Sequence, residues 1–501
     1  MTHFYIIFLG IVLLACSGCS SGNRAIPLDM PAEALENAVQ QVNGDPLFHN
    51  GDPIPQEWWL LFNDSQLSTF IQTTFARNPT LQSAKTQILA AAYNADRVRS
   101  SLYPYLSLGA DVSRQKLSKT GVIPFDSGPP GSGTPITSVP VMPGAPSPIP
   151  VYFTLYETEF NLNYHFDFWD KNRNTLRAAL GQVQATVAEE VFARLQIGIA
   201  VAEVYYQLQI DYQREEIATL IVDNRLRYVD LVQKRLNAHI DNQSTLQTAV
   251  YNLSAARDFL LQIQGDIAVK QYQLGAYMSG NFDEQIVGTD VVKQSLPKIS
   301  LPEDLPLHLI AQRPDISAQL WVIESAGYQI EAAKAGFYPD FNLMAFFGFQ
   351  TIHFADLFKW PSRYFNVDPA LSLPIFDGGL LLANLRGSEI HYDTAILDYN
   401  NLVINAAKEV LSAIAVLQNS SQRRNQFEQQ YAHQSELYRL THLKVSHHLS
   451  NRLDELLSEE AMLTAQDQAV LAQGNTIQAI LELIKALGGG YDGYNNCEGQ
   501  T

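Results

Sequence analysis

The longest regular feature of the chain is a proline-free stretch in which apolar residues recur at helical spacing. It runs from about Lys171 to Ala238, contains glycine only at Gly181 and Gly198, and could form one helix of roughly 100 Å at 1.5 Å per residue. A polar break at 237–242 follows, and a return helix then carries apolar residues at alternating spacings of three and four. These residues are Leu246, Ala249, Leu253, Ala256, Leu260, Ile263 and Ile267. The pattern predicts a long helical hairpin over about 171–279.

The same plan recurs later in the chain. A second helical run extends from about Leu380 to His442, and a polar break covers 446–451. The return helix ends in a regular apolar series, and three consecutive glycines then stop it. That series is Ile477, Ile480, Ile484 and Leu487, before Gly488, Gly489 and Gly490. A second helical hairpin is therefore predicted over about 380–487.

Four shorter segments alternate between apolar and polar residues, as β-strands do when their two faces meet different surroundings. The clearest one places Phe160, Leu162, Tyr164, Phe166 and Phe168 opposite Glu159, Asn161, Asn163, His165 and Asp167. Residues 365–375 alternate in a similar way, and so do the stretches that begin at Leu106 and Phe341. One face suits lipid and the other suits water, so we predict four membrane strands.

These elements belong to an internal duplication. The segment that starts Ala76-Arg77-Asn78-Pro79 recurs as Ala311-Gln312-Arg313-Pro314, and a second proline follows at the same distance in each copy. Each copy reads helix, strand pair and helical hairpin. The first repeat covers 65–280, with a helix over 66–102 and a β-hairpin over about 103–168. The second covers 305–490, with a helix over 310–336 and a β-hairpin over about 339–376; 281–304 is a linker and 491–501 a C-terminal tail.

Four strands cannot close a barrel by themselves. An open sheet edge in hydrocarbon leaves backbone groups unpaired at several kcal/mol each, so the chain must form an oligomer. Three copies would supply about twelve strands, which is enough to enclose a water-filled pore. The sequence therefore predicts an α+β membrane protein whose trimeric barrel continues into long helices.

The start of the chain carries an export signal. Residues 5–15 form an apolar run that is too short to span a bilayer, and polar residues follow it, so 1–15 is predicted to be a signal peptide. Leu13-Leu14-Ala15-Cys16 resembles a bacterial lipobox, in which the cysteine is acylated. We favour Cys16 over Cys19 because Leu13 stands three residues before it, although cleavage by the ordinary signal peptidase stays open. A serine follows either cysteine, and this favours the outer membrane over the inner one.

Composition narrows the function further. The chain has 33 basic and 51 acidic residues and a formal charge of -18, which argues against nucleic acid as a partner. Beyond the signal region only Cys497 remains, so the body has neither a disulfide framework nor a cysteine metal cluster. We find no nucleophile elbow and no phosphate-binding glycine loop. The only candidate metal ligands with suitable spacing are His239, His447 and His448, in the polar breaks of the two helical hairpins. The sequence thus predicts no enzyme, no cofactor and no metal.

Taken together, these motifs resemble the outer-membrane factors of tripartite efflux pumps. The likeness is to the TolC-like family, and most of all to its lipoprotein branch that serves resistance-nodulation-division pumps. It covers nearly all of the mature chain and rests on four motifs in a fixed order. They are Trp58 to Leu67, Arg313-Pro314-Asp315-Ile316, Phe376-Asp377-Gly378-Gly379 and Ala486-Leu487-Gly488-Gly489-Gly490.

The resemblance implies a homotrimer with a 12-stranded β-barrel in outer-membrane lipid and a periplasmic α-helical barrel. It also implies an equatorial domain, which the N-terminal segment 16–64 would wrap. Substrate would pass through passively, driven by an inner-membrane transporter that docks through a periplasmic adaptor. Two alternatives remain, a duct for type I protein secretion and a trimeric surface scaffold or adhesin. The exported substrate, the identities of adaptor and transporter, and the role of the proline-rich loop 121–150 are open.

The family closes its periplasmic end with acidic residues near the hairpin tips, where three like charges repel each other and attract cations. Laid on this chain, the family's tip glycine falls on His239 in the first hairpin and on or near His447 in the second. The acid that opens the return helix falls on Thr245 and Asp454. The resulting gate candidates are Asp454, Glu455 and Asp241, and the candidates for adaptor contact are His239, Asn242, His447, Ser450 and Arg452. Whether the tip histidines sense pH or bind metal stays open.

Overall fold

The structure is a computed structural model, and it describes residues 48–50, 54–116, 152–280, 296–301 and 313–491. The described chain divides into two compact units, both of which are built from several stretches of sequence. The helical unit takes the described parts of 1–89, 184–323 and 393–501. The sheet unit takes those of 90–183 and 324–392.

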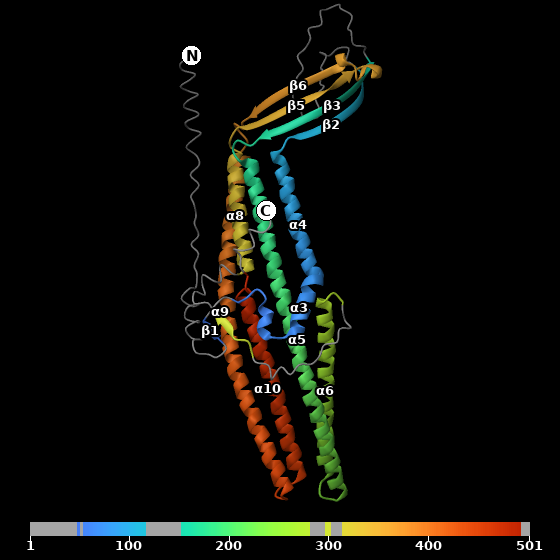
Figure 1. The fold of residues 1–501 in the computed structure, drawn as a ribbon, viewed down its shortest axis with the longest axis vertical. Helices are drawn as coiled ribbons and strands as arrows, with labels where there is room; N and C mark the ends of the chain where they lie inside the picture. Colours follow the sequence, from blue (N-terminus) through green and yellow to red (C-terminus); the bar gives the residue numbers. More distant parts are fainter. Residues whose placement is uncertain (1–47, 51–53, 117–151, 281–295, 302–312, 492–501) are drawn as a thin grey trace, which may run out of the picture. The chain divides into compact units, whose positions relative to one another are not determined.

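Two helical hairpins dominate the helical unit, as predicted. Each consists of a helix of 67 residues followed, after a short turn, by a return helix of 35 residues. The two members of each pair run side by side (Figure 1). The first hairpin is α5 (Lys171–Asn237) with α6 (Gln243–Tyr277), and the second is α9 (Leu380–Ser446) with α10 (Arg452–Ala486).

Side-chain contacts fix the order of these helices within the helical unit. The predicted seam of α6 is buried at Ala249, Leu253, Ala256, Ile263 and Ile267 and half-buried at its other two positions. Ion pairs and hydrogen bonds join α6 to α5 and α5 to α10, while α10 packs on α9. The order is therefore α6, α5, α10, α9, and among the described helices the two at the ends keep one side without a long helical neighbour.

The N-terminal part of the helical unit differs from the prediction of one helix over 66–102. It forms α3 (Ser65–Arg77) and α4 (Pro79–Arg99), followed by a 3-10 turn at Ser100–Leu102. Asn78 separates the two helices, because a residue before proline avoids the helical conformation while proline suits the first helical position. The Asn78 side chain accepts a hydrogen bond from the backbone N–H of Thr80 at 2.9 Å, which caps α4. In the second repeat α8 (Pro314–Ala335) begins at the corresponding proline.

A short 3-10 helix, η1 (Trp58–Phe62), buries its aromatic side chains in the core of the helical unit. Trp58 is 1 % exposed, and its ring meets those of Trp59 and Phe62 edge to face. Asp64 caps α3 through the N–H groups of Gln66 and Leu67 and accepts a 2.8 Å hydrogen bond from the Tyr205 hydroxyl. The first family-like motif is thus a clasp that holds the N-terminal segment onto α5.

The sheet unit contains the four predicted strands in one antiparallel sheet with the order β2-β3-β5-β6. Neighbouring strands lie side by side in Figure 1. The two strands of each repeat pair with each other, and β3 pairs with β5 to join the repeats. Their bounds are β2 (Tyr105–Lys116), β3 (Tyr152–Phe166), β5 (Asp340–Thr351) and β6 (Arg363–Ser372).

The register sorts the side chains by face, as the alternation predicted. Leu108 pairs with Phe160, Phe160 with Phe347, and Phe347 with Phe365, so one apolar row crosses the whole sheet. The exposed fractions of the outer two are 64 % and 71 %. Polar pairs such as Ser107 with Asn161 and Asp111 with Glu157 lie on the other face. Within the part of one chain that the structure describes, therefore, the sheet presents an uncovered apolar face and two unpaired edges, β2 and β6.

A second, two-stranded sheet pairs β1 (Phe48–Asn50) with β4 (Ile299–Leu301) in parallel. It joins the N-terminal segment to the connection between the two repeats. Among the helices that the structure describes, none combines the length and apolar character needed to cross a bilayer.

Candidate gate at the hairpin tips

The two hairpins turn in the same way at their tips. His239 and His448 both adopt the left-handed backbone conformation, with φ of 61° and 59°. Asn242 and Asn451 then cap the return helices by accepting the N–H of the third residue along, at 3.0 and 2.9 Å. Histidine therefore occupies the left-handed position where the family resemblance placed a glycine. In the second hairpin this position is His448, next to the predicted His447.

The first tip is fixed by an arginine. The Arg235 Nε donates to Asp241 Oδ2 at 2.7 Å, and its NH2 donates to the other carboxylate oxygen at 3.3 Å. The hydrogen bond to Asp241 raises the pKa of Arg235 above its ordinary value. Asp241, one of the predicted gate acids, is thus bound to a permanent cation in the same hairpin.

The second tip leaves Asp454 with a free charge. Asp454 lies exposed in the first turn of α10, and its Oδ2 accepts a 2.8 Å hydrogen bond from the Ser450 hydroxyl. It has no basic partner among the residues that the structure describes. Of the three predicted gate acids, Asp454 alone keeps an exposed carboxylate without a cation.

Glu455, the next residue, points into the hairpin instead. Its side chain is only 3 % exposed, and its Oε1 accepts from His442 Nδ1 at 2.7 Å and contacts Arg452 NH1 at 2.5 Å. Burial raises the pKa of the Glu455 carboxyl. The hydrogen bonds from His442 and Arg452 outweigh burial, so this pKa lies below its ordinary value of 4.5. Glu455 therefore joins α9 to α10, and Arg452, predicted as an adaptor contact, shares its carboxylate.

The remaining tip candidates lie at the surface. His239, Asn242 and His447 are exposed, and Ser450 is half-buried beneath Asp454. Asn242 also serves as the helix cap described above, so its side chain has a structural role. Cys16 and Cys19 lie outside the described residues. Within the described part of the chain, no group of three or more His, Cys, Asp or Glu side chains is arranged to hold a metal ion.

A polar contact that the sequence analysis did not predict joins the two hairpins close to the tips. Arg227 of α5 donates through NH2 to Glu459 Oε1 of α10 at 2.9 Å. Asn224, which is fully buried, donates to the other oxygen of Glu459 at 3.0 Å and to the carbonyl of Leu456 at 3.1 Å. Arg225 pairs with Glu460 beside them. We call Asn224, Arg225, Arg227, Glu459 and Glu460 the inter-hairpin seam.

Farther from the tips a buried ion-pair network continues this connection. Arg214 Nε of α5 donates to Asp467 of α10 at 2.9 Å, and Asp211 binds Lys270 of α6. Asp211 and Asp467 are 4 % and 6 % exposed, so both acids depend on these cations. Charge pairs thus link α6, α5 and α10 in one line.

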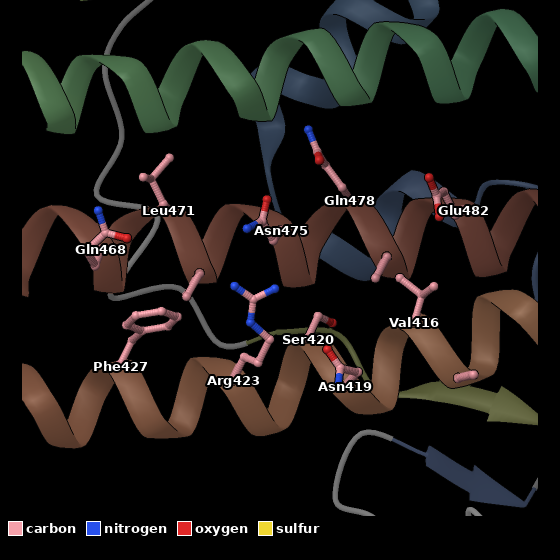
Figure 2. Close-up of a pocket in the computed structure, with 13 residues that line it drawn as sticks. Val416, Asn419, Ser420, Arg423, Phe427, Gln468, Leu471, Asn475, Gln478 and Glu482 are labelled. Carbon is pink, nitrogen blue, oxygen red and sulfur yellow. The ribbon is translucent and has the colours of Figure 1, made fainter. Parts of the chain in front are cut away.

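A groove of about 640 Å³ lies between α9 and α10. Its lining mixes amide and hydroxyl side chains, among them Asn419, Ser420 and Asn475, with apolar ones such as Val416 and Leu471. Figure 2 shows the Arg423 side chain extending from α9 toward α10. Its guanidinium lies 5.9 Å from the ring centroid of Phe427, and within the described residues it has no acidic partner. The groove wall is therefore of mixed polarity, and Arg423 and Glu482 are its charged residues.

Comparison with known proteins agrees with this architecture. The family model described as "Outer membrane efflux protein" matches residues 70–280 and 305–489, which are almost the two predicted repeats. The chain is 29 % identical over 495 residues to the multidrug resistance outer membrane protein MdtQ of Escherichia coli O6:H1, covering 96 % of both chains. It is 27 % identical to MdtP of Escherichia coli K12, over 87 % of this chain and 86 % of that one.

Solved structures show the same fold. The outer membrane protein VceC of Vibrio cholerae matches with a TM-score of 0.71 and 28 % identity, over 88 % of this chain and all of that chain. The CmeC outer membrane channel of Campylobacter jejuni matches with a TM-score of 0.76 and 20 % identity, over 89 % and 90 %. The duplicated helices and strands and these matches lead to one conclusion: the chain belongs to the outer membrane efflux protein family and is the outer-membrane channel of an efflux pump.

Proposed function

We propose that three copies of this chain form a closed duct that carries small toxic compounds outward across the periplasm and the outer membrane. The sheet carries this proposal, because its apolar face is uncovered and both of its edges are unpaired within one chain. Backbone groups at such edges cannot remain open in hydrocarbon. Three sheets of four strands, joined β6 to β2, would satisfy them in one barrel.

The helix order supports the same closure. With α6 and α9 at the ends of the row α6, α5, α10, α9, a neighbouring copy would set its α6 against α9. Exposed apolar side chains on both helices favour that contact, for example Tyr251 and Tyr272 on α6 and Leu437 on α9. The interface would be head to tail, and a head-to-tail contact closes into a ring of three when the rotation between neighbouring copies is one third of a full turn.

The gate in this proposal is a ring of three Asp454 carboxylates. Asp454 suits the role because its charge is exposed and uncompensated, whereas Asp241 is bound to Arg235 and Glu455 to His442 and Arg452. Like charges gathered at a constriction repel each other and attract cations. The ring would therefore favour cations and be blocked by multivalent ones.

The inter-hairpin seam supplies the restraint that keeps the gate shut. Opening would require the second hairpin to move against the first, and the seam is where the two are bonded nearest the tips. We further propose that a periplasmic adaptor docks on the tips through His239, Asn242, His447, Ser450 and Arg452. An inner-membrane transporter would then drive export, and Cys16, or Cys19, would carry the lipid anchor.

Drugs are the proposed cargo because both curated relatives are named for multidrug resistance. Selection of the compound would lie mostly with the transporter, since the described groove offers a mixed polar and apolar wall that is open to solvent rather than a closed binding pocket. Protein secretion is the alternative cargo, and no feature of the described chain favours it.

Single-channel conductance of the purified trimer in a planar bilayer tests the gate. We expect small, cation-selective currents that multivalent cations block, and we expect Asp454→Asn to lose the block. Asp258→Asn, which removes an exposed acid from α6, is the matched control and should behave as the wild type. Failure of a well-folded protein to conduct would contradict the duct, while block that survives in Asp454→Asn would contradict the ring.

A further inference from the structure

The two hairpin tips have the same backbone conformation but are held by different side-chain interactions. When the caps Asn242 and Asn451 are aligned, the left-handed residues His239 and His448 also coincide. The first tip is tied by Arg235 to Asp241, and at the aligned positions the second has Lys444 and Ser450. The duplication thus provides an internal comparison in which the fold is constant and the fastening differs.

The second tip is held by a different set of residues, His442, Arg452 and Glu455. His442 lies on α9, while Arg452 and Glu455 lie on the first turn of α10. Both basic groups reach the same oxygen, Oε1. The residues aligned with these three in the first hairpin are Gln233, Gln243 and Leu246, which cannot form an ion pair. This triad is therefore particular to the second tip.

His442 is the member that crosses from α9 to α10. Arg452 stands three residues before Glu455 on the same helix, so its contact does not join the two helices. The His442 side chain is 58 % exposed in the single chain. Glu455 Oε2 is buried and has no hydrogen-bond partner among the described residues, so the carboxylate depends heavily on what binds Oε1.

The other titratable and charged groups around the triad are Tyr438, Glu459, Arg227, Asp223 and Asp454. Tyr438 of α9 lies with its ring centroid 6.3 Å from that of His442. On α10 Glu459 is bound to Arg227 of α5, which also contacts Asp223 at 3.1 Å. In the turn, Asp454 is bound by the Ser450 hydroxyl. Histidine is the side chain among these that ordinarily changes charge between about pH 5 and 8.

We propose that His442 and Glu455 form a proton-dependent clasp that tightens the second hairpin tip at acidic pH and releases it as pH rises. A protonated imidazole donates a charge-assisted hydrogen bond to the buried carboxylate, and the neutral ring donates a weaker one. The first tip has a permanent clasp, because arginine keeps its proton throughout this range. The pH of the periplasm would then adjust one tip of each protomer and leave the other unchanged.

The consequence for transport rests on the proposed docking role of the tips. A loosened second tip would change the adaptor contact at His447 and Ser450, whereas the first tip would present a constant surface at His239. Efflux would respond to external acidity through the tip without a change in the gate acid itself.

Hydrogen–deuterium exchange of the full detergent-solubilised protein tests the clasp without requiring conductance. Between about pH 6 and pH 8, after correction for intrinsic exchange, we expect protection of 447–456 to fall about five-fold while that of 238–246 stays constant. His442→Gln should remove the pH dependence, and His442→Arg should keep the tip protected at the higher pH. His433→Gln, at an exposed histidine of the same helix, is the matched control.

Two results would overturn the clasp. One is pH-dependent protection of 447–456 that persists in His442→Gln, and the other is equal loosening of both tips. Neither depends on whether the protein conducts, so loss of the proposed duct and loss of the clasp can be told apart.

Discussion

Glu459→Gln is expected to loosen the two hairpins and raise the open probability of the channel. In the structure Glu459 receives Arg227 at 2.9 Å and Asn224 at 3.0 Å, from a helix of the other hairpin. Glutamine keeps the size of the side chain and one acceptor oxygen but removes the charge that Arg227 faces. The change should therefore weaken the seam without leaving a cavity.

The free energy that this substitution removes can be judged from the solvent exposure of the two side chains. The Arg227 side chain is 39 % exposed and that of Glu459 18 %, so solvent screens the pair and about 1 kcal/mol per protomer is a reasonable value. If three protomers open together, the change is about 3 kcal/mol and the ratio of open to closed channels rises about 150-fold.

Single-channel recording in a planar bilayer measures that ratio directly. Glu436→Gln is the matched control, because it removes a glutamate that pairs with Arg439 inside α9 and joins no other helix. The double exchange Arg227→Glu with Glu459→Arg should restore closure. An unchanged open probability in Glu459→Gln, or an equal rise in Glu436→Gln, would refute the role of the seam.

Three further changes probe the fold by thermal unfolding. Gly348→Ala should destabilise the sheet by on the order of 3 kcal/mol, because a Cβ there would lie 2.2 Å from a β3 carbonyl, whereas Gly109→Ala meets only ordinary contacts at 3.9 Å and should be nearly neutral. Arg313→Met should cost on the order of 3 kcal/mol, since Arg313 is 4 % exposed and bonds Glu409 at 2.8 Å, and an unchanged melting temperature would contradict its role. Burial raises the pKa of Glu203 above 4.5, so its ionisation opposes folding at neutral pH and costs nothing below its unfolded pKa. Glu203→Gln should accordingly raise the melting temperature near neutral pH and leave it unchanged at about pH 3.5, and the same gain at both would contradict this account.

Most of the secondary structure could be predicted because each long element has one dominant signal. The run without proline predicted α5 to within a residue of its observed end at Asn237, and the alternation of residues predicted the four strands of the larger sheet but not the short strands β1 and β4. Pro79 marks the start of the helix in the duplicated segment, yet the predicted helix over 66–102 ran through the break at Asn78, because the apolar pattern continues across it. Helix propensity and the periodicity of apolar residues predict a helical segment well, but they do not show where a capping residue such as Asn78 divides it.

The site could be predicted only in part, because its chemistry depends on which helices meet. Sequence comparison brought out Asp454 and Glu455 together, yet one is exposed and the other is 2 % exposed and paired. Nothing in the spacing of Arg227 indicates that it faces Glu459, since the two belong to different hairpins. The left-handed residue of the second tip fell one position beyond His447, which is the usual uncertainty where a helix ends.

The pairing of β1 with β4 has a consequence for biogenesis. Phe48–Asn50 emerges early from the export machinery, but its partner Ile299–Leu301 follows about 250 residues later. Strand β1 therefore stays unpaired while the whole first repeat crosses the inner membrane. During that time its unpaired edge is open to proteases and to other nascent chains. We expect periplasmic chaperones to protect this interval, and a chain truncated before residue 299 to be degraded rather than stored.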